Sequence, residues 1–293
     1  MLLLTGATGL VGSNLLRRLL AEGQQVRCLV RDPRRLGTQR VRVQIALGDL
    51  TDPPSFRNAL RGVDTVVHLA AAIRDQPKGS IEELDGIATW RMVEAAERQG
   101  VERFVFFSAL GASTHHRTRC LRAKALAEQA VAEADLQSVI FAPSIVYAPG
   151  DPWLTLLERM ALLPLMPMSG RGQARFQPIW AEDVADCIVA ALQNGTGAQR
   201  HRYELAGPET LSHGEMIRTV LAAQGRARPV VPVPTPIVSR MLRLLERAMG
   251  PRAFATWDEA ELMEVSMLSA RGSADVEALG VTPQRMSAVL EAA

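Results

Sequence analysis

Short apolar runs alternate with helical patterns through the first half of the chain. Between positions 15 and 20, four leucines form one face of a predicted helix, with Arg17 and Arg18 outside it. The predicted strands are Met1–Thr5, Val26–Val30, Val43–Leu47, Val63–Ala70, Arg103–Ser108 and Gln137–Phe141. The predicted helices are Leu10–Glu22, Ser55–Arg61, Ile81–Gln99 and Leu121–Ala134. Continuous apolar strands alternating with helices predict an α/β fold with a Rossmann-type, doubly wound parallel sheet.

After Pro143 the pattern loosens. A helix at Glu182–Leu192 and a strand at Arg202–Leu205 are expected to return to the sheet. The final stretch favours short helices separated by proline and glycine. The predicted division is a Rossmann core of residues 1–150, completed by 176–206, and a smaller, mostly helical lobe of 151–175 and 207–293.

Two segments of the smaller lobe carry distinct apolar patterns. Residues Leu156–Met168 are rich in leucine and methionine. Methionine adapts to varied apolar surfaces, so the segment could cover a lipid-like or quinone-like ligand or pack beneath the cofactor. The run Ile237–Met249 is amphipathic, with arginines opposite its apolar face. It could contact a membrane surface, a partner in a protein complex, or its own core.

Composition narrows the function classes. The 293 residues are 47% hydrophobic and carry a net charge of +2 without a long basic block, which disfavours nucleic acid as the partner. The cysteines Cys28, Cys120 and Cys187 have neither disulfide nor metal-ligand spacing, so no metal is expected. We expect no signal peptide, because the first predicted strand begins at residue 1. We expect no transmembrane segment, because no apolar run approaches about 18 residues. A cytoplasmic protein, peripheral at the inner face of a membrane or free of it, fits these features.

A glycine-rich segment, Thr5 to Gly12, connects the first predicted strand to the first helix. Gly6 permits a tight turn, Gly9 lets backbone approach a pyrophosphate, and Gly12 allows close helix packing. The helix start offers free N–H groups to phosphate. This context predicts a dinucleotide site. Its predicted contacts are Thr5, Gly6, Thr8, Gly9, Leu10, Val11 and Gly12.

The second strand runs into a basic turn that bears on the choice of cofactor. Arg31 and Arg35 could hold a 2′-phosphate through charge-assisted hydrogen bonds. Asp32 is the competing residue, because a carboxylate turned inward would favour NAD(H). An arginine-rich solvated loop is the simpler alternative. We favour NADP(H) over NAD(H).

Other strand ends add predicted cofactor contacts. Asp49 and Leu50 follow the third strand and are expected to flank the adenine, although Asp49 could simply cap a turn. Small residues after the fourth strand would let a cofactor pass close to the backbone. They are Ala70, Ala71 and Ala72.

These segments together resemble the short-chain dehydrogenase/reductase superfamily in its extended and atypical branches. The resemblance rests on TGATGLVG (5–12), VRDPRR (30–35), GDL (48–50), HLAAA (68–72), FFSALGA (106–112), APSIVYAPGD (142–151) and FQPIWAEDVADCIVAAL (176–192). It is strongest to the group that includes the nucleotide-binding accessory subunit of respiratory complex I and its bacterial relatives. Sugar-nucleotide epimerases and NmrA-like redox sensors are more distant. The resemblance implies that Pro143 and Ile145 lie beside the nicotinamide.

The superfamily's active site pairs a tyrosine with a lysine four residues later on one helix face. Lys124 matches the lysine, one of only two in the chain, and is expected to hold the nicotinamide ribose. Cys120 occupies the tyrosine position, and a thiol is too short to replace a phenol. Leu110 falls where a serine or threonine is expected, with Ser108 two residues earlier.

Three interpretations follow, ranked in this order. In the first, the protein holds NADP(H) without turnover, in a structural, assembly or redox-sensing role. Alternatively, it is an NAD(P)H-dependent oxidoreductase or epimerase with another proton donor, for which His115 and His116 are candidates, although both could be exposed loop residues. In the third, Cys120 is a reactive thiol activated by Lys124 and nearby arginines, whereas an inert half-buried cysteine is the commoner case.

Overall fold

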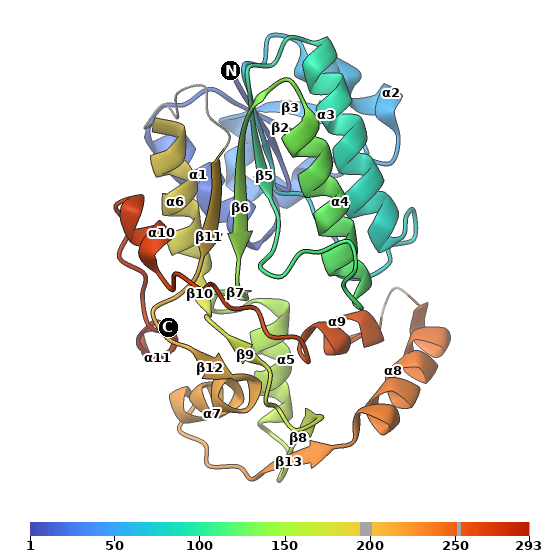
Figure 1. Cartoon of the computed structure of the whole chain (residues 1–293), viewed down its shortest axis with the longest axis vertical. Helices are drawn as coiled ribbons and strands as arrows, with labels where there is room; N and C mark the ends of the chain where they lie inside the picture. Colours follow the sequence, from blue (N-terminus) through green and yellow to red (C-terminus); the bar gives the residue numbers. More distant parts are fainter. Residues whose placement is uncertain (194–200, 251–252, 293) are drawn as a thin grey trace.

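A seven-stranded parallel sheet forms the centre of the protein in this computed structural model, which describes residues 1–193, 201–250 and 253–292 (Figure 1). The strand order β11-β6-β5-β4-β1-β2-β3 reverses beside β1, the pattern of a doubly wound sheet. All neighbouring pairs are parallel, which confirms the predicted α/β Rossmann-type fold. The strands are β1 Leu2–Thr5, β2 Val26–Val30, β3 Gln44–Leu47, β4 Thr65–His68, β5 Arg103–Phe107, β6 Gln137–Pro143 and β11 His201–Leu205.

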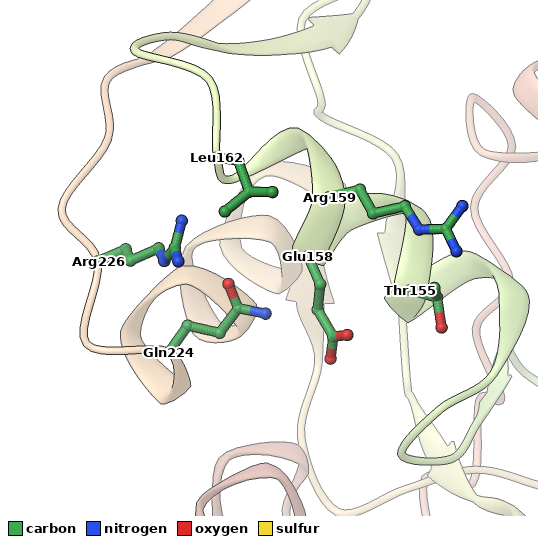
Figure 2. A pocket seen from close by; sticks show the side chains of 6 residues that line it. All are labelled: Thr155, Glu158, Arg159, Leu162, Gln224 and Arg226. Carbon is green, nitrogen blue, oxygen red and sulfur yellow. The ribbon is translucent and has the colours of Figure 1, made fainter.

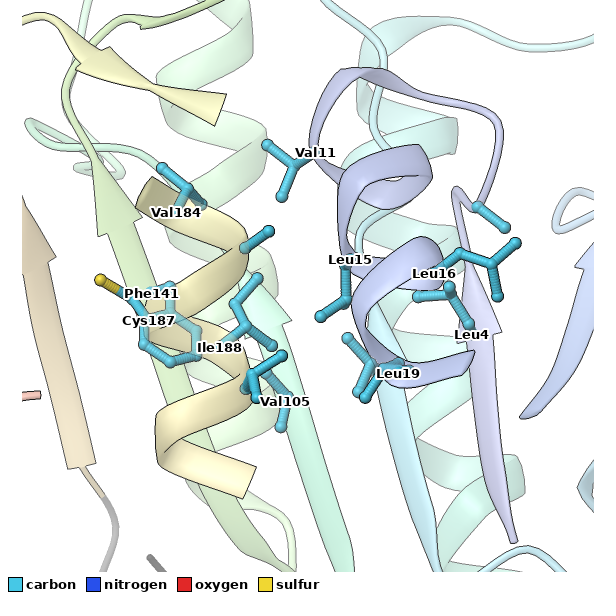
Figure 3. Close-up of a cluster of buried hydrophobic side chains, with 14 of the residues drawn as sticks. Leu4, Val11, Leu15, Leu16, Leu19, Val105, Phe141, Val184, Cys187 and Ile188 are labelled. Atoms are coloured by element: carbon cyan, nitrogen blue, oxygen red, sulfur yellow. The ribbon is translucent and has the colours of Figure 1, made fainter. Parts of the chain in front are cut away.

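Helices cover both faces of the sheet. One face carries α1 (Leu10–Ala21) and α6 (Ala181–Gln193), and the other carries α3 (Ala88–Arg98) and α4 (Arg119–Glu133). Successive strand residues divide between these layers: Leu4 joins the core under α1 and α6, whereas Leu3 joins the core under α3 and α4. Figure 3 shows Leu15 and Leu19 of α1 pointing toward α6, and Ile188 of α6 pointing back toward α1.

The smaller lobe lies below the carboxyl ends of the strands in Figure 1 and combines short helices with two-stranded sheets. Its helices are α5 Pro152–Met160, α7 His213–Ala223, α8 Thr235–Met249, α9 Trp257–Leu262 and α11 Met286–Glu291. The pairs are β8 Met166–Ser169 with β13 Val230–Val233, β9 Arg175–Phe176 with β12 Leu211–Ser212, and β7 Val146–Tyr147 with β10 Ile179–Trp180.

The proposed domain boundaries stay a prediction, and parts of the ranges (194–200, 251–252 and 293) lie outside the described residues. One segment assigned to the smaller lobe lies elsewhere. Helix α10 (Ala274–Ala278) packs against β11, where the Asp275 carboxylate accepts the Glu204 N–H at 2.7 Å. Val276 and Leu279 join the core beneath α1 and α6.

Two predicted helices are subdivided. The predicted helix Ile81–Gln99 begins with a π-helical stretch, η3 (Glu82–Ile87), before α3. Residues 55–61 divide between α2 (Pro53–Phe56) and a 3₁₀ turn, η2 (Arg57–Leu60). Among the described residues, no helix is both long and apolar enough to cross a membrane.

Candidate functional site

The turn between β1 and α1 brings glycines against neighbouring backbone. Gly6 has a φ of 71°, and a Cβ atom there would lie 2.7 Å from the Ala70 nitrogen. A Cβ atom on Gly12 would lie 2.1 Å from the Gly6 carbonyl oxygen, so a side chain at either position would displace the turn. Among the described residues, no side chain caps α1, whose N-cap is Gly9. Its first N–H groups can therefore serve an anion.

Thr5 ties this turn to the end of β4. Its Oγ1 accepts the Ala70 N–H at 3.3 Å and lies 3.0 Å from Nδ1 of His68. The remaining predicted cofactor contacts of this segment lie in the loop or in the first turn of α1. They are Thr8, Leu10 and Val11.

The end of β2 presents its two predicted guanidiniums to solvent. Arg31 and Arg35 are both exposed. The Asp32 carboxylate accepts the Arg34 N–H at 3.0 Å and caps η1 (Pro33–Val41), a 3₁₀ segment that the sequence pattern did not predict. Asp32, the residue that would favour NAD(H), is thus engaged within its own loop.

Asp49 keeps one carboxylate oxygen without a hydrogen bond. Oδ1 accepts from the backbone N–H and the hydroxyl of Thr51, at 3.1 and 3.0 Å. Oδ2 is buried and has no hydrogen-bond partner among the described residues, although Nζ of Lys78 lies 3.6 Å away. Burial favours the neutral acid, but the Thr51 bonds and the charges of Arg31 and Lys78 outweigh it and lower the pKa of Asp49. A buried anionic acceptor suits an amino group such as that of adenine, and Leu50 packs beside it against the core.

A buried chain of hydrogen bonds continues from His68. Its Nε2 lies 3.1 Å from the Thr89 hydroxyl, which donates to the Asp85 carbonyl at 2.7 Å. The Asp85 carboxylate in turn accepts the Ala72 N–H at 2.8 Å. Burial lowers the pKa of His68 to about 3, and the positive charge of Lys124 acts in the same direction. The imidazole is therefore neutral, and the chain fixes the loop that follows β4.

Asp85 is a candidate site residue that the sequence analysis missed. Its side chain is fully buried within η3, and Oδ2 has no hydrogen-bond partner among the described residues. Burial raises its pKa, against the opposing effects of Lys124 and the Ala72 N–H. A signal was present: in a helical projection, Asp85 lies on the same apolar face as Ile81 and Met92.

Lys124 and Ser108 meet the carboxyl end of β5. The Lys124 ammonium, only 5% exposed, donates to the Phe107 carbonyl at 2.8 Å and lies 5.1 Å from the Phe106 ring centroid. The Ser108 Oγ is buried and has no hydrogen-bond partner among the described residues. Both polar groups therefore have unused hydrogen-bonding capacity beside the strand end.

Cys120 lies one helical turn before Lys124 and is buried against Ile81 and Ala123. Burial raises the pKa of its thiol to about 12, Asp85 adds to the effect, and Lys124 only partly opposes it. The thiol is protonated at neutral pH, so its surroundings do not support the activated-thiol interpretation.

Leu110, which occupies the position of the superfamily's serine or threonine, is part of the apolar core. Leu110 is 2% exposed and packs in the cluster beneath the smaller lobe. Its N–H donates to the carbonyl of Pro143, the buried last residue of β6, at 2.8 Å. Ile145 follows in the same connection and is half-buried.

The two histidines lie in the loop before α4. His115 is exposed, with Nδ1 at 3.1 Å from the Thr114 hydroxyl. Nδ1 of His116 accepts the Thr118 N–H at 3.1 Å. Burial and the charge of Arg117 lower the pKa of His116. These contacts give His116 a local structural role at the start of α4.

Arg119 joins this region to the smaller lobe. Its guanidinium pairs with Asp75 after β4 at 2.9 Å, with Glu82 of η3 at 2.7 Å and with Asp258 of α9 at 3.3 Å. Nearby, Arg74 donates to the Ala253 carbonyl at 2.7 Å. Helix α9 is thereby held against the sheet edge at which Lys124 lies.

Two cavities lie away from these residues. One of about 520 Å³ lies between α5 and the end of α7 and is lined by Glu158, Arg159 and Arg226 among others (Figure 2). Another of about 360 Å³ lies at the amino ends of the strands, beside Gln24 and Arg103. In the described ranges, no group of three or more His, Cys, Asp or Glu side chains could hold a metal ion.

Comparison with known proteins identifies the family. Residues 6–195 match the family described as NAD(P)H-binding. The chain belongs to this NAD(P)H-binding family. It is 31% identical over 247 residues to NADH dehydrogenase (ubiquinone) 1 alpha subcomplex subunit 9, mitochondrial, of Arabidopsis thaliana, covering 80% of this chain and 61% of that protein. It is 30% identical to sterol demethylase protein B of Methylococcus capsulatus, covering 85% of this chain and 83% of the relative.

A solved structure shares the fold of this NAD(P)H-binding protein. A nucleoside-diphosphate-sugar epimerase from Staphylococcus aureus superposes with a TM-score of 0.81 over 99% of both chains, at 19% sequence identity. The sequence relatives and this shared fold confirm the resemblance to the atypical short-chain dehydrogenases/reductases and to the complex I accessory subunit.

Proposed function

We propose that this protein binds NADP(H) along the carboxyl ends of β1 to β6 and holds it without turnover, in a structural, assembly or redox-sensing role. The residues present fit such a cofactor. The Gly6–Gly12 turn and the uncapped α1 suit the pyrophosphate, and the Asp49 oxygen that accepts no hydrogen bond among the described residues suits the adenine. The buried hydroxyl of Ser108 and the ammonium of Lys124 would serve the nicotinamide side.

The arrangement after β2 supports NADP(H) over NAD(H). The exposed guanidiniums of Arg31 and Arg35 can reach a 2′-phosphate, whereas the Asp32 carboxylate is occupied as the cap of η1. An inward carboxylate would have repelled that phosphate. Each charge-assisted hydrogen bond to the phosphate would contribute about 1.5–3 kcal/mol.

The proposal rests mainly on one observation, that a buried cysteine, Cys120, occupies the position of the superfamily's tyrosine. Bound nicotinamide nucleotide supplies hydride chemistry, and a carbonyl substrate needs a proton donor beside it. The thiol at this position is buried, has a pKa of about 12 and is shorter than the phenol it replaces. Leu110, in the serine position, offers no hydrogen bond from its side chain. These features support retention of the nucleotide rather than its turnover.

The relatives extend the proposal to a partner and a location. Because the Arabidopsis relative is a subunit of an NADH dehydrogenase complex, we propose that this chain also acts within a protein complex. Such a role fits a cytoplasmic protein that is peripheral at the inner face of a membrane. Within the Leu156–Met168 segment, Leu157, Met166 and Met168 are buried in the core of the lobe, which supports a packing role for these side chains rather than contact with an apolar ligand. The loop leucines between them are exposed.

A turnover assay on NADPH-loaded protein tests this proposal. Loaded protein is incubated with ketones, quinones and nucleotide sugars, and nicotinamide absorbance is followed alongside free NADPH. We expect stoichiometric binding and oxidation at the rate of free NADPH. Substrate-dependent oxidation above that rate would contradict the proposed role.

The second candidate function is that of an oxidoreductase or epimerase. The buried carboxyl group of Asp85 favours this function. Its raised pKa and unpaired oxygen, near Lys124, are those of a buried carboxyl able to hold a proton. If turnover is found, Asp85→Asn should abolish it while NADPH binding persists. His116→Gln should leave it unchanged, because His116 is engaged by Thr118.

A further inference from the structure

Helix α8 exposes an apolar stripe along its length. Ile237, Met241 and Leu244 are 49%, 64% and 63% exposed, and their spacing of four and three residues places them on one face. Ala248, also exposed, extends that face by another turn. No residue of α8 is buried. The helix lies at the lower right of the molecule in Figure 1, at the opposite end from the N-terminus.

The charges of α8 are divided between its sides. Arg240 and Arg247 are exposed next to the apolar stripe. Glu246, the only acidic residue of the helix, turns toward α9 and accepts the Trp257 N–H. On the same side, the Arg243 guanidinium lies 5.7 Å from the Trp257 ring centroid. The side of α8 that faces solvent is therefore apolar and basic.

The longer segment that includes α8 has the same basic and apolar character, with Arg226 and Arg228 added to the charges of the helix. Residues 224–249 contain five arginines and one glutamate, in a chain whose net charge is only +2. Strand β13, which leads into α8, pairs with β8. The loop before β8 exposes further apolar side chains, Leu162, Leu163 and Leu165.

We propose that α8 is an interfacial helix that lays its apolar stripe into the headgroup region of a bilayer rich in anionic lipid. Leucine, isoleucine and methionine would enter the acyl boundary, while Arg240 and Arg247 reach the phosphates beside it. Charge complementarity selects this occupant, because the exposed side carries guanidiniums without carboxylates. The docking does not depend on bound nucleotide.

Flotation of the full chain with vesicles tests the docking. One set consists of phosphatidylcholine alone, and the other contains about one-third phosphatidylglycerol. We expect flotation with the anionic vesicles, little with the neutral ones, and release as salt is raised. Equal partition to both sets, or to neither, would overturn the proposal; absence from both would leave α8 as a surface for a protein partner.

Paired variants separate the apolar and basic contributions. Met241→Glu should abolish flotation, whereas Val41→Glu, at an 82% exposed position of the nucleotide-binding half, should not. The double variant Arg240→Gln with Arg247→Gln should weaken anionic-vesicle binding about 30-fold. Each arginine near the membrane surface contributes about 1 kcal/mol, and each 1.4 kcal/mol changes the affinity about tenfold. Arg57→Gln with Arg61→Gln removes the same charge from another exposed surface and should have a much smaller effect.

Folding and nucleotide binding are measured on every variant. The substituted side chains of α8 are exposed, so thermal unfolding and NADPH affinity should match the unsubstituted protein. A variant that no longer floats but still binds NADPH would support the membrane docking independently of the proposed nucleotide binding. Flotation that persists in Met241→Glu would overturn it, whatever the nucleotide result.

Discussion

The ammonium of Lys124 donates a hydrogen bond to the Phe107 carbonyl across 2.8 Å, which fixes a buried positive charge at the carboxyl end of β5. A nicotinamide ribose at this strand end would complete the hydrogen bonds of the ammonium. Lys124→Met should therefore weaken NADPH binding about 10- to 100-fold, the range of a lost charge-assisted hydrogen bond. Arg57→Met removes an exposed cation as a control. Unchanged affinity by fluorescence titration of Lys124→Met would remove Lys124 from the site.

Arg31 should select the cofactor. Arg31→Ala is expected to weaken NADPH binding about 10- to 100-fold and to leave NADH binding nearly unchanged, because only NADPH carries the 2′-phosphate. Arg34→Ala is a matched control three residues along the chain, since Arg34 contributes its backbone N–H to the Asp32 cap. Both affinities come from the same titration. An equal loss for both nucleotides would mean that Arg31 supports the loop rather than the phosphate.

The layered core follows from patterns that are visible in the sequence. The apolar runs of β1, β2, β4, β5 and β6 are long enough to be read as buried strands, and the glycines after β1 mark a turn with no room for side chains. The short pairs of the smaller lobe could not be predicted in this way. A two-residue strand such as Arg175–Phe176 has no periodicity, and only tertiary pairing with Leu211–Ser212 defines it.

The site is harder to predict from the sequence than the fold is, because its polar contacts join segments that are distant along the chain. The glycine turn, the Arg31 turn and Lys124 are local motifs, so their neighbourhood could be anticipated. The His68–Thr89–Asp85 chain could not, since it requires β4, α3 and η3 to be packed together. Asp85 also interrupts a regular helical prediction: its side chain bonds to the loop after β4, and the surrounding turn is π-helical.

The cysteines should be inert in the native protein. Cys28, Cys120 and Cys187 are buried, and burial raises the pKa of each thiol to about 12. A thiol reagent at neutral pH should label none of them until denaturant is added, after which all three should react. Mass spectrometry of the labelled protein gives the count and the positions. Rapid native labelling of Cys120 would restore the activated-thiol interpretation.

Stability should fall in mild acid because of His68. An unfolded histidine takes up a proton near pH 6.5, whereas burial holds the pKa of native His68 at about 3. Unfolded chains therefore bind more protons in this window. The contribution of neutral His68 is fully present above pH 6.5 and is lost as the pH falls toward 3, by at most about 1.4 kcal/mol per unit.

Denaturant unfolding at several pH values measures this slope. His68→Gln should flatten the curve below pH 6.5, whereas His115→Gln, in an exposed loop, should run parallel to the unsubstituted protein. His213, whose pKa burial lowers to about 4, leaves a residual slope in both. Curves of equal slope for His68→Gln and the unsubstituted protein would show that His68 titrates normally in the native state.

The most direct test of the central claim is the fate of NADPH bound to the purified protein, followed by nicotinamide absorbance during prolonged incubation with candidate ketones, quinones and nucleotide sugars. Retention in a one-to-one complex, with oxidation no faster than that of free NADPH, is the predicted result. Oxidation that accelerates with one of these substrates, and that disappears in Asp85→Asn, would contradict the claim and establish an oxidoreductase.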